Sequence, residues 1–192
     1  MGQSISWLAV HAPPEEARAA LGLNATGETL EIPEAPLVGA ELNGGWYLVI
    51  AQGCDHALVR DDFVSSISTE RDAVACSIEE HVMWSSASFW SGGKSVWSVA
   101  HDAQESIDHF TASGTPPPSF AEIRDRLLEQ QESEGGADAD VDLVFDLPLE
   151  LADQIVGFKH DGGASLYPEV FEVLDPGESG SLLMKKPWWK FW

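Results

Sequence analysis

The sequence predicts an α+β fold with a mixed or mostly antiparallel sheet and three or four helices. Short apolar runs of strand length alternate with amphipathic helical segments, and turns rich in Gly and Pro separate them. An internal similarity further indicates that one β-α unit occurs twice. With 192 residues, 44% of them hydrophobic, the chain is long and apolar enough to build one substantial core.

The first unit begins with an apolar strand at residues 5–10. Pro13 opens the helix that follows, Glu15 lies in its first turn, where the helix dipole favours an acid, and Gly22 ends it. A short extended piece completes the unit.

The middle of the chain is predicted to be mostly strands. We expect strands at residues 45–51 and 73–78, with a short helix at residues 61–69 between them. A hairpin then spans residues 81–101 about a turn at residues 91–94, whose two central residues are glycines.

The expected hairpin register brings aromatic residues together. With two central residues in the turn, the numbers of paired residues sum to 185, so Trp84 lies opposite His101. Trp84, Trp90 and Trp97 then share one face, and together with His101 they form a candidate aromatic recognition surface. The same stripe is also typical of the core face of a strand.

A helix and an acidic loop follow the hairpin. The proline run at residues 116–118 precedes a helix with Ser119 as its expected N-cap, and residues 132–140 form a glycine-rich acidic loop. Beyond this loop we expect a strand at residues 141–145 and a helix with Asp146 as its N-cap.

These last elements resemble the first unit in sequence. Residues 7–34 align with residues 142–169 without a gap, and eight of the 28 positions are identical. About two identities are expected by chance from ordinary residue usage. We therefore expect the two segments to superpose as a pseudo-symmetric duplicated β-α unit, with convergence on a common motif as the alternative. The identical pairs are Leu8 and Leu143, Pro13 and Pro148, Glu15 and Glu150, Ala17 and Ala152, Gly22 and Gly157, Gly27 and Gly162, Pro33 and Pro168, and Glu34 and Glu169.

The domain organisation follows from these segments. We assign residues 1–135 to a main α+β lobe and residues 136–174 to a second β-α unit packed on the first. Residues 175–192 form a linker and a basic, aromatic tail. The tail residues expected to bind a partner are Lys185, Lys186, Trp188, Trp189, Lys190, Phe191 and Trp192. Four aromatic rings carry a large apolar area, so we expect the tail to dock on its own body, on a second copy or on another protein.

The charge balance narrows the classes of partner. Ten basic residues stand against 32 acidic ones, a net charge of −22. This balance argues against nucleic acid, whose phosphates require a basic face, and against anionic membranes. A basic protein or a cationic ligand is the natural partner, and acidity that only serves solubility is the alternative. The first residues carry no basic segment followed by a long apolar one, so we expect a cytoplasmic protein.

No catalytic signature accompanies these features. His101, Asp102, Asp108 and His109 form the densest group of candidate metal ligands, but no spacing typical of a metal motif occurs. We therefore expect no metal and no cofactor. Cys54 follows a predicted strand, and the carboxylate next to it raises the pKa of a thiol and disfavours its use as a nucleophile.

The sequence thus leads us to expect a small acidic cytosolic protein-binding protein, of adaptor, regulatory or immunity type, without catalytic activity. Two alternatives stay open. One is a metal-assisted hydrolase that uses the group of His101, Asp102, Asp108 and His109. The other is a structural homodimer completed by its aromatic tail.

Overall fold

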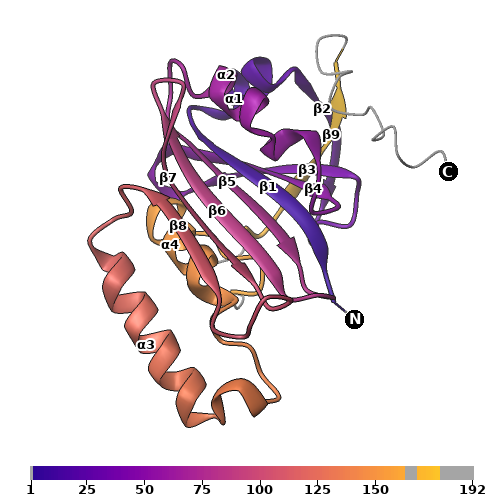
Figure 1. Cartoon of the computed structure of the whole chain (residues 1–192). Helices are drawn as coiled ribbons and strands as arrows, with labels where there is room; N and C mark the ends of the chain where they lie inside the picture. The colour runs from indigo at the N-terminus through magenta and orange to yellow at the C-terminus, as the bar shows by residue number, and fades with distance from the viewer. Residues whose placement is uncertain (1, 163–167, 178–192) are drawn as a thin grey trace, which may run out of the picture.

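The structure is a computed structural model, which describes residues 2–162 and 168–177 (Figure 1). In the described residues, one antiparallel sheet of nine strands dominates, in the order β2-β9-β3-β4-β1-β5-β6-β7-β8, and four α-helices pack around it. The arrangement is α+β. The strands are β1 (Ser4–His11), β2 (Leu23–Leu30), β3 (Leu37–Leu42), β4 (Trp46–Gln52), β5 (Ala73–Glu79), β6 (Trp84–Ser91), β7 (Lys94–Asp102), β8 (Phe110–Gly114) and β9 (Phe171–Pro176). The α-helices are α1 (Pro14–Leu21), α2 (Asp61–Ile67), α3 (Ser119–Ser133) and α4 (Asp146–Val156), and the short 3-10 helices are η1 (Asn43–Gly45), η2 (Ala57–Val59) and η3 (Gly136–Asp138).

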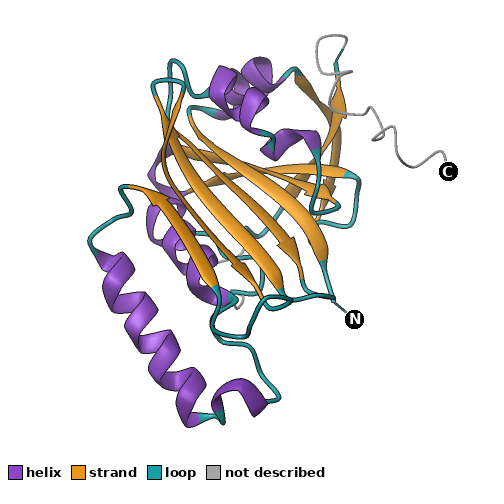
Figure 2. Ribbon diagram, in the orientation of Figure 1, coloured by secondary structure: helices purple, strands orange, loops and turns teal. Residues whose placement is uncertain are grey.

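Both faces of the sheet carry apolar cores. Strand β1 lies at its centre, with Leu8 and Val10 packed toward α1, η2 and α2, and Trp7 and Ala9 packed toward α3 and α4. Figure 2 shows α1 and α2 on one side of the sheet and α4 on the other. Because a strand covered on both faces buries every side chain, its sequence is a continuous apolar run without alternation.

Strand β9, near the C-terminal end of the described chain, lies between β2 and β3 in the sheet and pairs with both. Its Glu172 is fixed there: the Tyr47 hydroxyl donates to Glu172 Oε1 at 2.5 Å, and Arg18 Nη1 donates to the same oxygen at 2.6 Å. Burial raises the pKa of Tyr47 well above its usual range, so the phenol stays a donor. Strand β9 also includes Asp175 and Pro176, which we had assigned to the linker.

The hairpin register differs from the prediction beyond its turn. Ser91 pairs with Lys94 about Gly92 and Gly93 as expected, but the register shifts between Phe89 and Trp90. Trp90 pairs with Ser95 and Phe89 with Trp97, so one extra residue, Val96, bulges from β7. Trp84 therefore lies opposite Asp102. A one-residue bulge moves every later side chain of β7 to the other face, which separates Trp97 from Trp90.

The duplicated unit is not confirmed. Helices α1 and α4 both end at a glycine in the left-handed conformation, Gly22 at φ 68° and Gly157 at φ 73°. Residues 141–145, however, form no strand, and residues 158–162 form none where the first copy has β2. In α3, Ser119 lies inside the first turn and Pro118 takes the N-cap position, so the expected cap is wrong by one residue.

Candidate functional site

An open hollow of about 570 Å³ lies where β5 ends and β6 begins. We call it the Trp84 hollow. Val82 and Trp84 supply apolar surface, and Asp55 and Glu79 supply carboxylates; Val82 is 41% exposed. The residues that line it are Cys54, Asp55, His56, Val59, Arg60, Ser77, Glu79, Val82 and Trp84.

Two serines of β1 position the loop that walls this hollow. Ser4 Oγ accepts a hydrogen bond from Cys54 N at 3.2 Å. Ser6 Oγ donates to Gly53 O at 2.7 Å and accepts from His56 N at 3.3 Å. The loop turns at Gly53, whose φ of 93° favours glycine. Because both serines belong to β1, the loop is tied to the start of the central strand.

Glu79 is one of two carboxylates that line the hollow. Hydrogen bonds from Ser4 and from His81 lower the pKa of Glu79 to about 2, so its carboxylate is ionised at neutral pH. The contact with His81 joins Nδ1 to Glu79 Oε1 at 2.6 Å. Arg60 also lines the hollow, but Asp62 binds its guanidinium with both carboxylate oxygens, at 3.1 and 2.6 Å. The charge of Arg60 is therefore already matched.

Cys54 and His56 lie beside each other without the chemistry of a nucleophile and its base. Burial, and then the carboxylates of Glu79 and Asp55, raise the pKa of the Cys54 thiol. Burial lowers the pKa of His56, whose Nδ1 accepts a hydrogen bond from Leu58 N at 3.2 Å. The thiol thus stays protonated at neutral pH, and thiolate attack has no support here.

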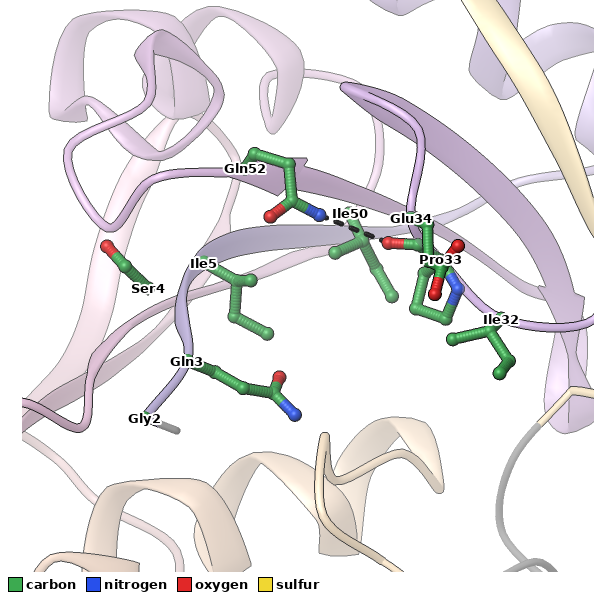
Figure 3. A pocket seen from close by; sticks show the side chains of 9 residues that line it. All are labelled: Gly2, Gln3, Ser4, Ile5, Ile32, Pro33, Glu34, Ile50 and Gln52. Atoms are coloured by element: carbon green, nitrogen blue, oxygen red, sulfur yellow. Dashed lines mark hydrogen bonds between the residues drawn. The ribbon is translucent and has the colours of Figure 1, made fainter.

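A second hollow, of about 590 Å³, lies at the same end of the sheet on the face of α4 (Figure 3). We call it the Ile5 hollow. Figure 3 shows the side chains of Ile5 and Ile50, from neighbouring strands, and of Ile32 pointing into the same space. Ile32 is 62% exposed there. The lining residues are Gly2, Gln3, Ser4, Ile5, Ile32, Pro33, Glu34, Ile50 and Gln52.

The structure separates the four residues of the expected aromatic surface. Trp84 and Trp90 face the side of α2 and η2, with Trp90 buried and its Nε1 donating to Ser88 Oγ at 2.9 Å. Trp97 and His101 face the side of α3 and α4, and both are buried. The single aromatic face is therefore a wrong prediction, because the bulge at Val96 changes the face of Trp97.

The group around His101 does not converge on a metal site. His101 is fully buried, with Nδ1 2.6 Å from His109 O and Nε2 2.8 Å from Asp142 Oδ2, so both ring nitrogens are engaged. Asp102 and Asp108 instead accept hydrogen bonds from residues two positions away. Within the described residues, no group of three or more His, Cys, Asp or Glu side chains is placed to hold one metal ion. The four residues named for the hydrolase alternative therefore do not converge on one metal position.

The tail residues 185–192 lie outside the described residues. Across residues 2–162 and 168–177, no helix has the length and apolar character needed to cross a membrane.

Comparison of the chain with protein-family models, with curated proteins and with solved structures gives no match. The geometry and charge of this chain alone therefore indicate its function.

Proposed function

We propose that this chain is a non-catalytic, cytosolic protein-binding protein that engages a basic partner, with the Trp84 hollow as the anchor point. The observation that carries the proposal is an excess of carboxylates without counter-charges. In the described part of the chain all five arginines and Lys159 form ion pairs, which occupy seven carboxylates. The other acidic side chains there form no ion pair with a described lysine or arginine.

Such an excess favours association with a cationic surface. It speeds the encounter of oppositely charged molecules and rejects acidic competitors. Exposed ion pairs each contribute only about 0–1 kcal/mol, so charge alone gives weak binding. A hollow that removes part of the partner from water is needed as well.

The Trp84 hollow provides that second contribution. A lysine or arginine side chain placed in it lays its methylene groups on Val82 and Trp84 and its charge near Glu79 and Asp55. A cation over an indole ring gains about 0.5–1 kcal/mol at an exposed site. Because hydrogen bonds hold Glu79 ionised, the hollow keeps its negative charge throughout the physiological pH range.

Binding of a short fluorescent oligoarginine peptide tests the proposal, with fluorescence anisotropy as the readout. We expect saturable binding to the full chain that weakens as salt rises from about 0.05 to 0.5 M, and no binding of an oligoglutamate peptide. Glu79→Gln weakens the affinity about 3- to 10-fold, which corresponds to about 0.7–1.4 kcal/mol. Glu122→Gln, the same change on the exposed surface of α3, has a smaller effect. Equal effects of the two substitutions would refute the hollow as the anchor.

A further inference from the structure

We infer that the Ile5 hollow is the docking site of the chain's own C-terminal aromatic segment, residues 185–192, bound within the same molecule. This inference does not depend on the Trp84 hollow or on a basic partner. It rests on the apolar lining of the hollow, on where the described chain ends, and on the charges of the two parts.

The lining of the Ile5 hollow calls for an apolar occupant. Ile5, Ile50, Ile32 and Pro33 form its apolar lining, and the Gln52 side chain donates to Pro33 O at 3.1 Å, which fixes the rim (Figure 3). Ile32 is the most exposed of the large hydrophobic side chains in the described residues. A volume of about 590 Å³ falls in the range of pockets that bind drug-sized ligands, roughly 300–1,000 Å³.

The end of the described chain lies within reach of this hollow. Gly177 N donates to Gly22 O at 2.8 Å, directly after β9. The pairing of Val38 with Val173, of Leu37 with Ala51 and of Ile5 with Gln52 places the end of β9 and the start of β1 at the same end of the sheet. Three strand spacings separate β9 from β1 in the sheet, and the twist of the sheet widens the separation of their ends.

The intervening chain is long enough to cross these strands. Eleven residues lead from Gly177 to Trp188, and a random-coil chain of eleven residues spans about 18 Å on average and roughly 36–40 Å when fully extended. The linkage raises the effective concentration of the tail to the millimolar range, so even weak apolar contacts suffice for docking. A separate peptide of the same sequence has no such advantage.

Charge favours the same arrangement. The tail carries three lysines and no acidic residue, whereas residues 1–184 carry seven basic and 32 acidic residues, a net −25. Glu34 lines the hollow itself. Exposed ion pairs are individually weak, so the lysines orient the tail and the buried rings of Trp188, Trp189, Phe191 and Trp192 hold it.

Isoleucine methyl NMR on the full chain tests this inference. Trp188→Ala with Trp189→Ala removes two rings, and we expect the methyl signals of Ile5, Ile32 and Ile50 to shift as the ring currents disappear. Ile67 and Ile123, which pack in the cores elsewhere, serve as internal controls and keep their positions. Unchanged signals from all three lining isoleucines would overturn the inference. So would shifts that vanish on dilution, because they would mean docking on a second copy.

A pair of matched substitutions then distinguishes the two hollows. Ile32 and Val82 are both exposed aliphatic residues, one in each hollow, so either can become serine without loss of core packing. We expect Ile32→Ser to accelerate tryptic cleavage after Lys190 several-fold and Val82→Ser to leave it unchanged. Faster cleavage in Val82→Ser alone would place the tail in the other hollow and contradict the inference.

Discussion

At the scale of single residues, close approach explains a glycine that looks out of place. Gly39 lies inside β3, where glycine weakens a strand. A Cβ built there would come 2.1 Å from the Tyr47 hydroxyl oxygen and 2.9 Å from Leu174 Cδ1. The Tyr47 hydroxyl occupies this space in order to donate to Glu172. Gly39 thus makes room for the contact that fixes β9.

Gly39→Ala is therefore expected to destabilise the folded chain. Because the neighbouring atoms are closely packed, we expect it to lower the free energy of unfolding by about 2–3 kcal/mol in urea denaturation. Gly27→Ala serves as the control, since nothing lies within 4 Å of a Cβ there and only its φ of 87° opposes the change, at about 1 kcal/mol. Equal losses for the two variants would show that crowding at Tyr47 is not the cause.

The ionisation of Glu79 makes the free energy of unfolding depend on pH in the acid range. Folding lowers its pKa from the usual 4.5 to about 2, so the ionised form favours the folded state. The resulting stability is present above about pH 4.5 and is lost as the pH falls toward 2. We expect the difference in unfolding free energy between the natural chain and Glu79→Gln to shrink across this window. A difference independent of pH would contradict the assignment.

At the scale of elements, backbone groups of residues 136–145 bond to side chains. Gln131, buried on α3, donates to Gly136 O at 3.1 Å and to Val141 O at 3.0 Å, and its Oε1 accepts from Leu143 N at 2.8 Å. Ser85 Oγ donates to Phe145 O at 2.7 Å. These bonds satisfy the apolar segment at 141–145 without a partner strand, which is why the strand predicted there does not form.

Gln131→Ala should consequently loosen the connection between α3 and α4. It leaves three backbone groups without partners, and we expect a loss of about 2–4 kcal/mol in unfolding free energy. Hydrogen exchange at the Leu143 amide accelerates with it. Gln130→Ala, on the exposed side of the same helix, changes both quantities little. An unaltered exchange rate at Leu143 would argue against the role of Gln131.

Sequence patterns predicted several elements whose signals lie within their own segments. Strands β4 and β5 and helix α2 appear close to their expected bounds, because apolar runs and helix signals lie within each segment. Strand β3 escaped prediction because Gly39, which suits a turn, is required by a tyrosine of the next strand. The bulge at Val96 left no signal in the sequence, and it alone changes the face of Trp97.

At the scale of the whole molecule, the strand order could not be predicted from the sequence, because it depends on the pairing of segments that lie far apart in the chain. Strand β9 pairs with β2 and β3 across more than a hundred residues, and no local pattern specifies that partner. The Trp84 hollow was predictable only in part. Trp84 was a candidate, whereas Glu79 joins it because the two residues pair across β5 and β6, and His56 joins it because Ser6 holds the loop after β4 against the sheet.

The net negative charge of the chain acts at the scale of the whole molecule, where it favours a cationic partner. Because nearly every described basic side chain is already paired, the excess charge is available to a partner. A cationic partner gains long-range attraction from the whole surface and a defined contact in the Trp84 hollow. Binding of such a partner therefore has a general, salt-dependent contribution from the surface and a local contribution from the Trp84 hollow.

Titration of the full chain with an oligoarginine peptide, followed by NMR of the tryptophan indole N–H signals, tests the central claim most directly. Trp84 lines the hollow, whereas Trp90 and Trp97 are buried and act as internal references. The account predicts a saturable shift of the Trp84 signal that Glu79→Gln weakens, with the Trp90 and Trp97 signals nearly unmoved. A peptide that binds without moving the Trp84 signal would contradict the claim that this hollow is the anchor point for a basic partner.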